Sequence, residues 1–266
     1  MVEIDWSTED MRDVFFDRVY ELASEDERIV FLSADHGAFS LEKFKRDFPD
    51  RYFNTAIAEQ NTIGVAAGLA LSGKIVYVYG IASFVSLRVL EQITIDLAAM
   101  NLPVNIVSVG AGFTYSTDGP THQGIQDLPA VMTVPNLSVF NSSDPLSTRA
   151  FAEIAVKEPG AKYIRIEKGC LNPLLPELSH NYSEGVASIR NGVDLLIVSS
   201  GAILHEAIAA AKLLEKETGL KTGVVDLYRL KPLPFKSLLN LLEPAEKIIT
   251  IEEGLLVGGV GQTIGT

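Results

Sequence analysis

Short apolar runs alternate with longer amphipathic runs along most of this chain, and this alternation limits the folds that it can adopt. Residues 29–35, 74–80 and 104–110 read IVFLSAD, KIVYVYG and VNIVSVG, and segments with helical features separate them. Strands that are apolar on both faces are typical of a parallel sheet covered by helices on both sides. We therefore predict an α/β fold with a mainly parallel sheet between helices.

The helices are predicted from the spacing of apolar residues and from signals at their ends. Thr8 is a candidate N-cap for a helix over residues 9–24. Gly73 marks the end of a helix of small residues over 60–71. The other elements predicted in this part of the chain are helices over 40–48, 83–101 and 146–157 and strands over 52–56, 137–140 and 163–166.

A change in composition and periodicity divides the chain. Residues 168–185 contain two prolines and polar clusters without a periodic pattern, which is typical of a linker. We predict a first domain over 1–168, a linker over 169–185 and a smaller α/β domain over 186–266. The final residues, GGVGQTIGT, resemble the start of a helix, so we expect this second domain to be incomplete. Its predicted elements are strands over 194–200, 221–227 and 247–252 and helices over 202–218 and 235–242.

Composition excludes several classes of partner and site. Lys and Arg number 22 and Asp and Glu number 34, so the formal charge is 22 − 34 = −12. This charge argues against nucleic acid or an anionic membrane as the main partner. The single cysteine, Cys170, excludes a disulfide framework and suits a reducing cytoplasm. One cysteine and four histidines also argue against a metal site in this chain. No targeting or membrane-spanning segment is apparent.

Glu59 is the first candidate for chemistry. It stands almost alone as a charged residue between Thr55 and Ser72, where a predicted strand passes into a predicted helix. A glutamate at the start of a helix often only interacts with the helix dipole. The alternative is a buried functional acid, and the flanking alanine and glycine residues would let a ligand approach the backbone closely.

The segment TDGPTHQG over residues 117–124 is the second candidate. It gathers Asp118 and His122 in one loop rich in glycine and proline. Such loops carry functional side chains at the edge of a rigid sheet, although a simple surface turn is the ordinary alternative. A histidine in such a loop more often has a chemical role than one on an apolar helix face.

Weaker candidates lie at strand ends and on helices. Asp35 and His36 follow a predicted strand directly, where ligands bind in open α/β sheets, although a structural turn is equally consistent. Arg165 lies inside a predicted strand, so alternation directs it toward one polar face, either a site or solvent. The remaining candidates are Arg12, Phe84 and Arg88. The ordinary alternative for an arginine is exposure to solvent, and for a phenylalanine it is packing in the core.

Two motifs together resemble a known family. AEQNTIGVAAGLALSGK and DGPTHQG, about sixty residues apart, are similar to the pyrimidine-binding domain of transketolase-like enzymes, which depend on thiamine diphosphate. The resemblance spans the whole chain, with residues 186–266 similar to part of the family's C-terminal domain. It is strongest to split transketolases and 1-deoxyxylulose-5-phosphate synthases, and weaker to the beta subunits of 2-oxo acid dehydrogenases.

The resemblance implies a role for each candidate. Glu59 matches the glutamate that shares a proton with N1′ of the cofactor's aminopyrimidine, so that the cofactor forms its ylid. His122 is implied both as a catalytic residue and as a substrate ligand. The remaining cofactor contacts implied are Phe84, Ile81, Asp35 and Arg88, and the remaining substrate contacts are Asp118, Arg12, Arg165 and His36.

The sequence departs from the family pattern in two ways. The family usually has a histidine near the position of Gly110, and its absence leaves the substrate sugar and its phosphate open. No GDG motif followed by an asparagine-rich stretch is present, so the diphosphate and its Mg²⁺ must be bound by another chain. We expect an N-terminal transketolase subunit as partner, in a heterotetramer or with a homodimer formed through the pyrimidine-binding domain.

The expected function is therefore that of the C-terminal subunit of a split, cytoplasmic transketolase. It would transfer a two-carbon ketol unit between sugars or sugar phosphates. One alternative is a subunit with the chemistry of 1-deoxyxylulose-5-phosphate synthase or of a 2-oxo acid dehydrogenase, favoured slightly by the run that begins at Arg88. Another alternative is a non-catalytic partner, which the intact Glu59, Asp118 and His122 argue against.

Overall fold

The computed structural model describes residues 5–175 and 180–265, and in them two sheets carry the fold. The first sheet has seven strands in the order β10-β5-β6-β4-β3-β1-β2, and every pairing except β10 with β5 is parallel. This confirms the predicted α/β class with a mainly parallel sheet. The strands are β1 (Ile29–Ser33), β2 (Tyr52–Asn54), β3 (Ile75–Ile81), β4 (Val104–Val109), β5 (Ser138–Asn141), β6 (Lys162–Ile166) and β10 (Arg229–Lys231).

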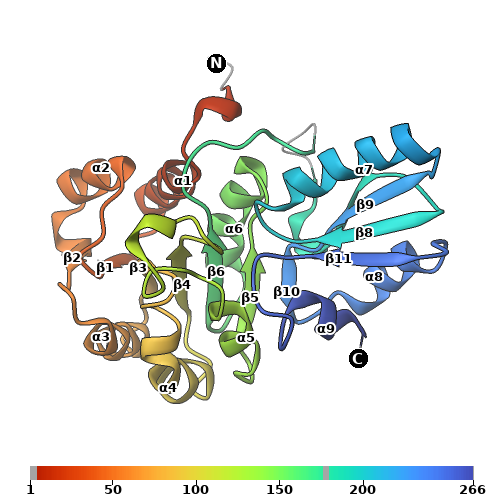
Figure 1. The fold of residues 1–266 in the computed structure, drawn as a ribbon. Helices are drawn as coiled ribbons and strands as arrows, with labels where there is room; N and C mark the ends of the chain where they lie inside the picture. Colours follow the sequence, from red (N-terminus) through yellow and green to blue (C-terminus); the bar gives the residue numbers. More distant parts are fainter. Residues whose placement is uncertain (1–4, 176–179, 266) are drawn as a thin grey trace.

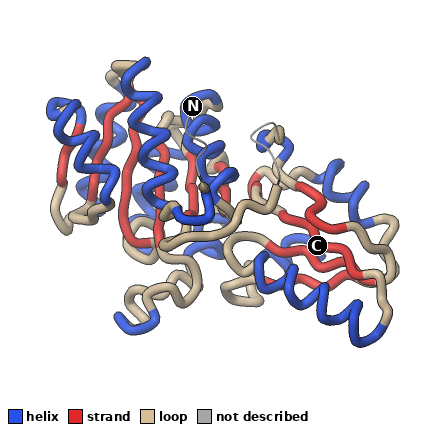
Figure 2. The backbone as a smooth tube through the Cα atoms, turned by 90° about the horizontal axis from the view of Figure 1, so that it is seen from above, coloured by secondary structure: helices blue, strands red, loops and turns tan. Residues whose placement is uncertain are grey.

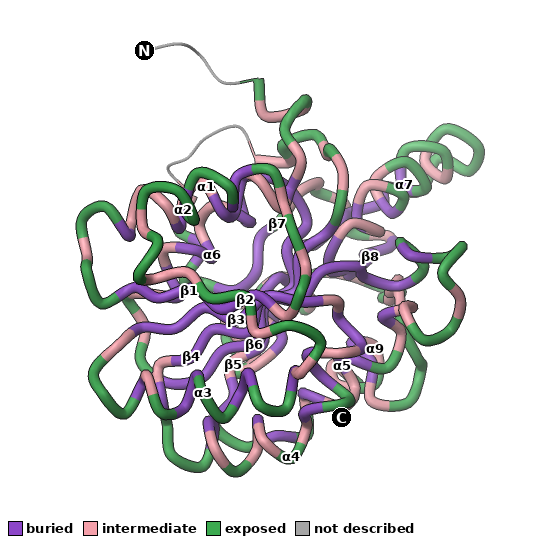
Figure 3. Tube along the Cα trace, turned by 90° about the vertical axis from the view of Figure 1, so that its left-hand side faces the viewer, coloured by how far each residue is buried: buried purple, intermediate pink, exposed green. Residues whose placement is uncertain are grey.

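Helices cover both faces of this sheet (Figure 1). One face packs against α1 (Met11–Glu25), α2 (Phe39–Asp47) and α6 (Pro145–Lys157), through a cluster that includes Phe15, Phe44 and Phe151. The other face packs against α3 (Glu59–Leu71), the segment around α4 (Leu90–Gln92) and α5 (Asp127–Met132). The central strands are buried on both faces, which explains their continuous apolar sequences. Figure 3 shows these buried strands inside a more exposed shell of helices and loops.

Helix starts and ends differ from the prediction where a better cap is available. The N-cap of α1 is Asp10, whose side chain accepts a hydrogen bond from the backbone N–H of Arg12, so Thr8 is not the cap. A carboxylate at this position also interacts favourably with the helix dipole. Thr8 instead lies in a short 3₁₀ turn, Trp6–Thr8.

The long helix predicted over residues 83–101 is interrupted. A 3₁₀ turn (Leu87–Val89) leads into α4, which continues as a π-helical segment, Ile93–Ala98. Apolar periodicity indicates a helical segment but does not distinguish α, 3₁₀ and π geometry, because all three present similar faces over a few residues. The 3₁₀ turn places Arg88 next to α3, where it contacts Glu59.

The second sheet lies beside the first, as Figure 2 shows. Its strand order is β11-β8-β9-β7, and only β7 is antiparallel to its neighbour. Its elements are β7 (Ala187–Arg190), β8 (Leu195–Ser199), β9 (Thr222–Asp226) and β11 (Ile248–Ile251), with helices α7 (Leu204–Thr218), α8 (Phe235–Leu242) and α9 (Val260–Gly265).

The sequence patterns miss three elements, α5, β7 and β10. Each is too short for a periodic pattern, and β10 joins the first sheet although it lies in sequence between β9 and β11 of the second. Part of the predicted linker, residues 176–179, lies outside the described residues. The division at 1–168, 169–185 and 186–266 stays a prediction.

Neither a membrane span nor a metal cluster is found in the described part of the chain. No helix there is long and apolar enough to cross a bilayer. Within residues 5–175 and 180–265, no three His, Cys, Asp or Glu side chains are grouped so that they could hold a metal ion. Cys170 is an exposed free thiol.

Candidate active site

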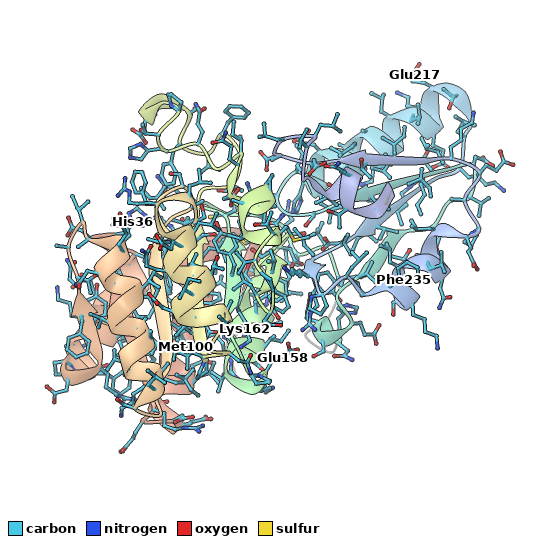
Figure 4. The ribbon with its side chains drawn as sticks, turned by 90° about the horizontal axis from the view of Figure 1, so that it is seen from below. His36, Met100, Glu158, Lys162, Glu217 and Phe235 are labelled. Atoms are coloured by element: carbon cyan, nitrogen blue, oxygen red, sulfur yellow. The ribbon has the colours of Figure 1, made fainter. Side chains whose placement is uncertain are left out.

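The candidate residues gather where the strands of the first sheet end. Parallel strands bring their carboxyl ends to one edge, and loops at that edge carry ligand contacts in open α/β sheets. His36 follows β1, Phe84 follows β3, and the loop with His122 follows β4. Figure 4 shows His36 at this edge, while Lys162, the first residue of β6, lies toward the opposite one.

Glu59 and Arg88 form the first pair in this site. The Glu59 side chain is only 4% exposed, and its Oε2 accepts a hydrogen bond from Nη1 of Arg88 at 2.8 Å. The Arg88 guanidinium also lies over the Phe84 ring, 4.1 Å from its centroid. The planar, positively charged guanidinium of Arg88 thus contacts both the buried Glu59 carboxylate and the half-buried Phe84 ring.

His122 extends this arrangement from the loop after β4. Its ring lies edge-on to Phe84, with centroids 5.0 Å apart, and its Nδ1 is 3.0 Å from the hydroxyl of Thr121. The loop is fixed over β3, because Ser83 donates a hydrogen bond to the Thr121 carbonyl at 2.7 Å. Through Arg88, which contacts both Glu59 and Phe84, the structure brings Glu59 close to Phe84 and His122, although Glu59 and His122 belong to motifs about sixty residues apart.

The structure explains why residue 110 is a glycine, which the sequence did not reveal. Its φ is +93°, and a Cβ at this position would collide with the ring of Tyr115. The Tyr115 ring therefore fills the space beside residue 110, and its hydroxyl lies 3.4 Å from Nε2 of His36. Tyr115 thereby places a polar atom near the point where the family resemblance implies a histidine.

A cationic cluster lies around His36, and we define it as Arg12, His36 and Lys168. Asp10 binds both Nε and Nη2 of Arg12, at 2.9 and 3.0 Å, which raises the pKa of the guanidinium. Burial lowers the pKa of His36 to about 4, and the charges of Arg12 and Lys168 act in the same direction. The imidazole is therefore neutral at pH 7, and the positive charge of the cluster resides on Arg12 and Lys168.

Lys168 is the member of this cluster that sequence reasoning missed. Its ammonium lies 5.5 Å from the centroid of the Tyr115 ring, and its side chain is exposed. Among the residues that the structure describes, none forms an ion pair with it. The signal was available, because Lys168 is the second residue after β6, at the ligand-binding edge of the sheet.

Three predicted residues lie at the same edge with fewer contacts. Asp35 is exposed, has a φ of +52° and accepts a hydrogen bond from Nδ2 of Asn54 at 3.0 Å. Asp118 is exposed in a 3₁₀ turn of the His122 loop. Ile81 is half-buried at the end of β3.

Arg165 has a different environment from the one predicted. Its side chain is 2% exposed, and its Nε lies 3.1 Å from Oδ2 of Asp127, which is 1% exposed. Its Nη2 donates to the carbonyl of Gly124 and, at 3.4 Å, to that of Glu253. Alternation along β6 directs this side chain into the core beneath the loop, where the guanidinium is buried against Asp127. The role of Arg165 in substrate binding stays a prediction.

Glu167, next to the cationic cluster, is a buried carboxyl whose protonation should affect folding stability. Burial raises its pKa from the ordinary 4.5 to about 7, although Oε1 accepts hydrogen bonds from Thr114 at 2.6 Å and from the backbone N–H of Lys168 at 2.7 Å. Because the folded chain binds this proton more tightly than the unfolded chain, stability is lost as the pH rises from about 4.5 through 7.

We expect Glu167→Gln to raise the free energy of unfolding at pH 8 by roughly 2–3 kcal/mol, because the amide carries no buried charge. At pH 4 the difference should nearly vanish. Denaturant unfolding of variant and wild type at both pH values measures this, and comparison at each pH cancels the opposite contribution of His36. The exposed Glu184→Gln is the control, and an equal effect of both variants at pH 8 would refute the assignment.

Comparison with known proteins identifies the family. Residues 7–173 match the family model of the transketolase pyrimidine-binding domain, and residues 185–266 match that of the transketolase C-terminal domain. The chain is 32% identical over 255 residues to one of the subunits of the apulose-4-phosphate transketolase of Phocaeicola vulgatus, covering 95% of this chain and 81% of the relative. The chain belongs to the transketolase family.

Within the family, similar proteins are subunits of split transketolases. The 6-deoxy-6-sulfo-D-fructose transketolase subunit of Clostridium sp. is 32% identical over 94% of this chain and 78% of its own length. The 1-deoxy-D-xylulose-5-phosphate synthase of Gloeobacter violaceus is 35% identical over 94% of this chain, but this chain spans only 40% of that protein. A solved structure described as a split-gene transketolase, an inactive beta4 tetramer, superposes with a TM-score of 0.86 at 33% identity, covering 96% of this chain and 83% of that one.

Proposed function

We propose that this chain is the pyrimidine-binding subunit of a split transketolase, which transfers a two-carbon ketol unit between sugars that carry an anionic group. The observation that carries the proposal is the buried Glu59 carboxylate beside the Phe84 ring, at the edge of the sheet where His122 also lies. The split-transketolase relatives support the same conclusion.

The residues of this site suit thiamine diphosphate. Phe84 is half-buried with a face that accepts a flat group, and Glu59 offers a carboxylate within reach of that group. When bound, the cofactor supplies an electron sink for the cleavage and formation of carbon–carbon bonds. In this proposal Phe84 and Ile81 pack on the aminopyrimidine ring, and Glu59 exchanges a proton at its N1′ atom.

The remaining site residues are proposed to bind the sugar. His122 and Asp118 face the substrate from the same loop and hydrogen-bond its hydroxyl groups. Arg12 and Lys168 would hold the terminal anion, with His36 and Tyr115 as uncharged hydrogen-bonding groups beside it. Lys168 replaces Arg165 in this role, because Arg165 is buried against Asp127.

A partner subunit would complete the site by binding the diphosphate and Mg²⁺. The exposed face of α3 supports a close partner, because neither Gly64 nor Gly68 has any atom within 4 Å of the place where a Cβ would stand. Their lack of side chains is therefore not required by packing within the chain. Val65 and Leu71 on the same helix are 41% and 63% exposed. A second backbone could approach this face closely.

Reconstitution tests the proposed reaction. This chain, mixed with a chain that carries the diphosphate-binding domain, should transfer a two-carbon unit from a ketose phosphate to an aldose when thiamine diphosphate and Mg²⁺ are present. Consumption of pyruvate instead would favour the chemistry of 1-deoxyxylulose-5-phosphate synthase or of a 2-oxo acid dehydrogenase. If the mixture binds cofactor but processes neither donor, the chain is a non-catalytic partner.

A further inference from the structure

Arg88 contacts Glu59 and Phe84 at the same time. Its Nη1 donates to Oε2 of Glu59 at 2.8 Å, and its guanidinium plane lies 4.1 Å from the centroid of the Phe84 ring. These two groups, an aromatic face and a buried carboxylate, are the ones that the proposed function assigns to the aminopyrimidine. A planar cation and a planar heterocycle cannot share them.

We propose that Arg88 competes with the aminopyrimidine ring of the cofactor: it pairs with Glu59 and covers the Phe84 ring in the cofactor-free subunit, and it must leave before the aminopyrimidine can bind. This inference rests on the proposed function and adds a step to it. Arg88 is then a positioning residue that competes with the cofactor, and not one of its ligands.

Burial explains why Glu59 needs this counter-ion. The Glu59 side chain is 4% exposed, and a buried carboxylate without a partner is strongly destabilising. Among the residues that the structure describes, Arg88 is the only cation paired with Glu59. The pair therefore gives the buried carboxylate a counter-ion, and the same guanidinium connects Glu59 to the Phe84 ring.

The position of Arg88 also allows it to leave. Its side chain is 42% exposed, so its charged end can move into water without crossing the core. Its backbone stays in place, because the residue belongs to the 3₁₀ turn and its carbonyl accepts a hydrogen bond from Nε2 of Gln60 at 3.3 Å. Displacement thus costs one charge-assisted hydrogen bond and one ring contact, with no change in the fold.

The test compares cofactor binding by Arg88→Gln and by wild type, each assembled with the partner chain. Thiamine diphosphate with Mg²⁺ is the probe, and calorimetry and stopped-flow measurement give affinity and association rate. Loss of the competing contact should tighten binding and speed association by about tenfold. Arg28→Gln, which breaks an exposed Arg–Asp pair of 2.7 Å elsewhere, is the matched control and should bind like wild type.

Two results would overturn the inference. Unchanged or weaker binding by Arg88→Gln, with tight binding by wild type, would show that Arg88 does not compete with the cofactor. A structure of the cofactor-loaded wild-type assembly in which Arg88 still binds Glu59 would show the same without any variant, and a displaced Arg88 would support the proposal. If the wild-type assembly binds no cofactor at all, the proposed function fails and this inference fails with it.

Discussion

Glu59→Gln is expected to lower the turnover of the reconstituted enzyme by about 10²–10⁴-fold, the usual contribution of a positioned general acid or base. Glutamine keeps the size of the side chain and can still form hydrogen bonds, but it cannot exchange a proton with N1′. The cofactor should therefore bind within about tenfold of wild type. The loss should appear equally in kcat and kcat/KM, because the proton activates the cofactor and does not bind substrate.

Two variants serve as controls for this result. Glu91→Gln removes an exposed carboxylate from the neighbouring helical segment and should leave turnover unchanged. His122→Ala should mainly raise KM for the sugar, because this histidine faces the substrate in the proposed site. If Glu59→Gln kept near-normal turnover while binding cofactor, Glu59 would not be the general acid–base and the chain would be better described as a scaffold.

Arg165→Leu is expected to lower the free energy of unfolding by about 3–5 kcal/mol, because removing one partner leaves the other charge of a buried pair uncompensated. That partner is Asp127, which is 1% exposed and also accepts a hydrogen bond from the hydroxyl of Tyr163 at 2.9 Å. The backbone carbonyl of Gly124 in the His122 loop would lose one of its two donors as well, because the N–H of Gly112 also donates to it. Chemical denaturation measures the change.

The double variant Arg165→Leu/Asp127→Leu distinguishes the net contribution of the ion pair from the cost of leaving one charge unpaired. It should recover much of the lost stability, since no unpaired charge remains in the core. Lys168→Ala provides the functional contrast, with stability near wild type and a raised KM for an anionic sugar. An Arg165→Leu variant with wild-type stability and a raised KM would show instead that Arg165 binds substrate.

The prediction from sequence succeeded where a pattern fixes geometry. Apolar runs separated by helices define a parallel sheet, and a parallel sheet brings its strand ends to one edge. Glu59, Phe84 and His122 all follow strands, so their position at one edge of the sheet could be predicted. The presence of the second sheet could also be predicted, because the same alternation recurs after residue 186.

The sequence was less informative where the direction of a side chain decides which residue reaches the site. Arg165 and Lys168 are three residues apart in the segment that carries β6, and the sequence does not show which one leaves the core. Position within the strand directs Arg165 inward, while Lys168 lies two residues beyond the last strand residue and reaches the edge. Tyr115 was missed for a related reason, since its role depends on the space that Gly110 leaves open.

The most direct test of this account is a calorimetric titration of thiamine diphosphate with Mg²⁺ into three samples: this chain, its partner chain, and the two mixed. The chain has the pyrimidine-binding residues, and the motif for the diphosphate and the metal is absent from its sequence. We therefore expect weak or undetectable binding by this chain and tight binding by the mixture. Tight binding by this chain alone would contradict the claim that its site is completed by a second subunit.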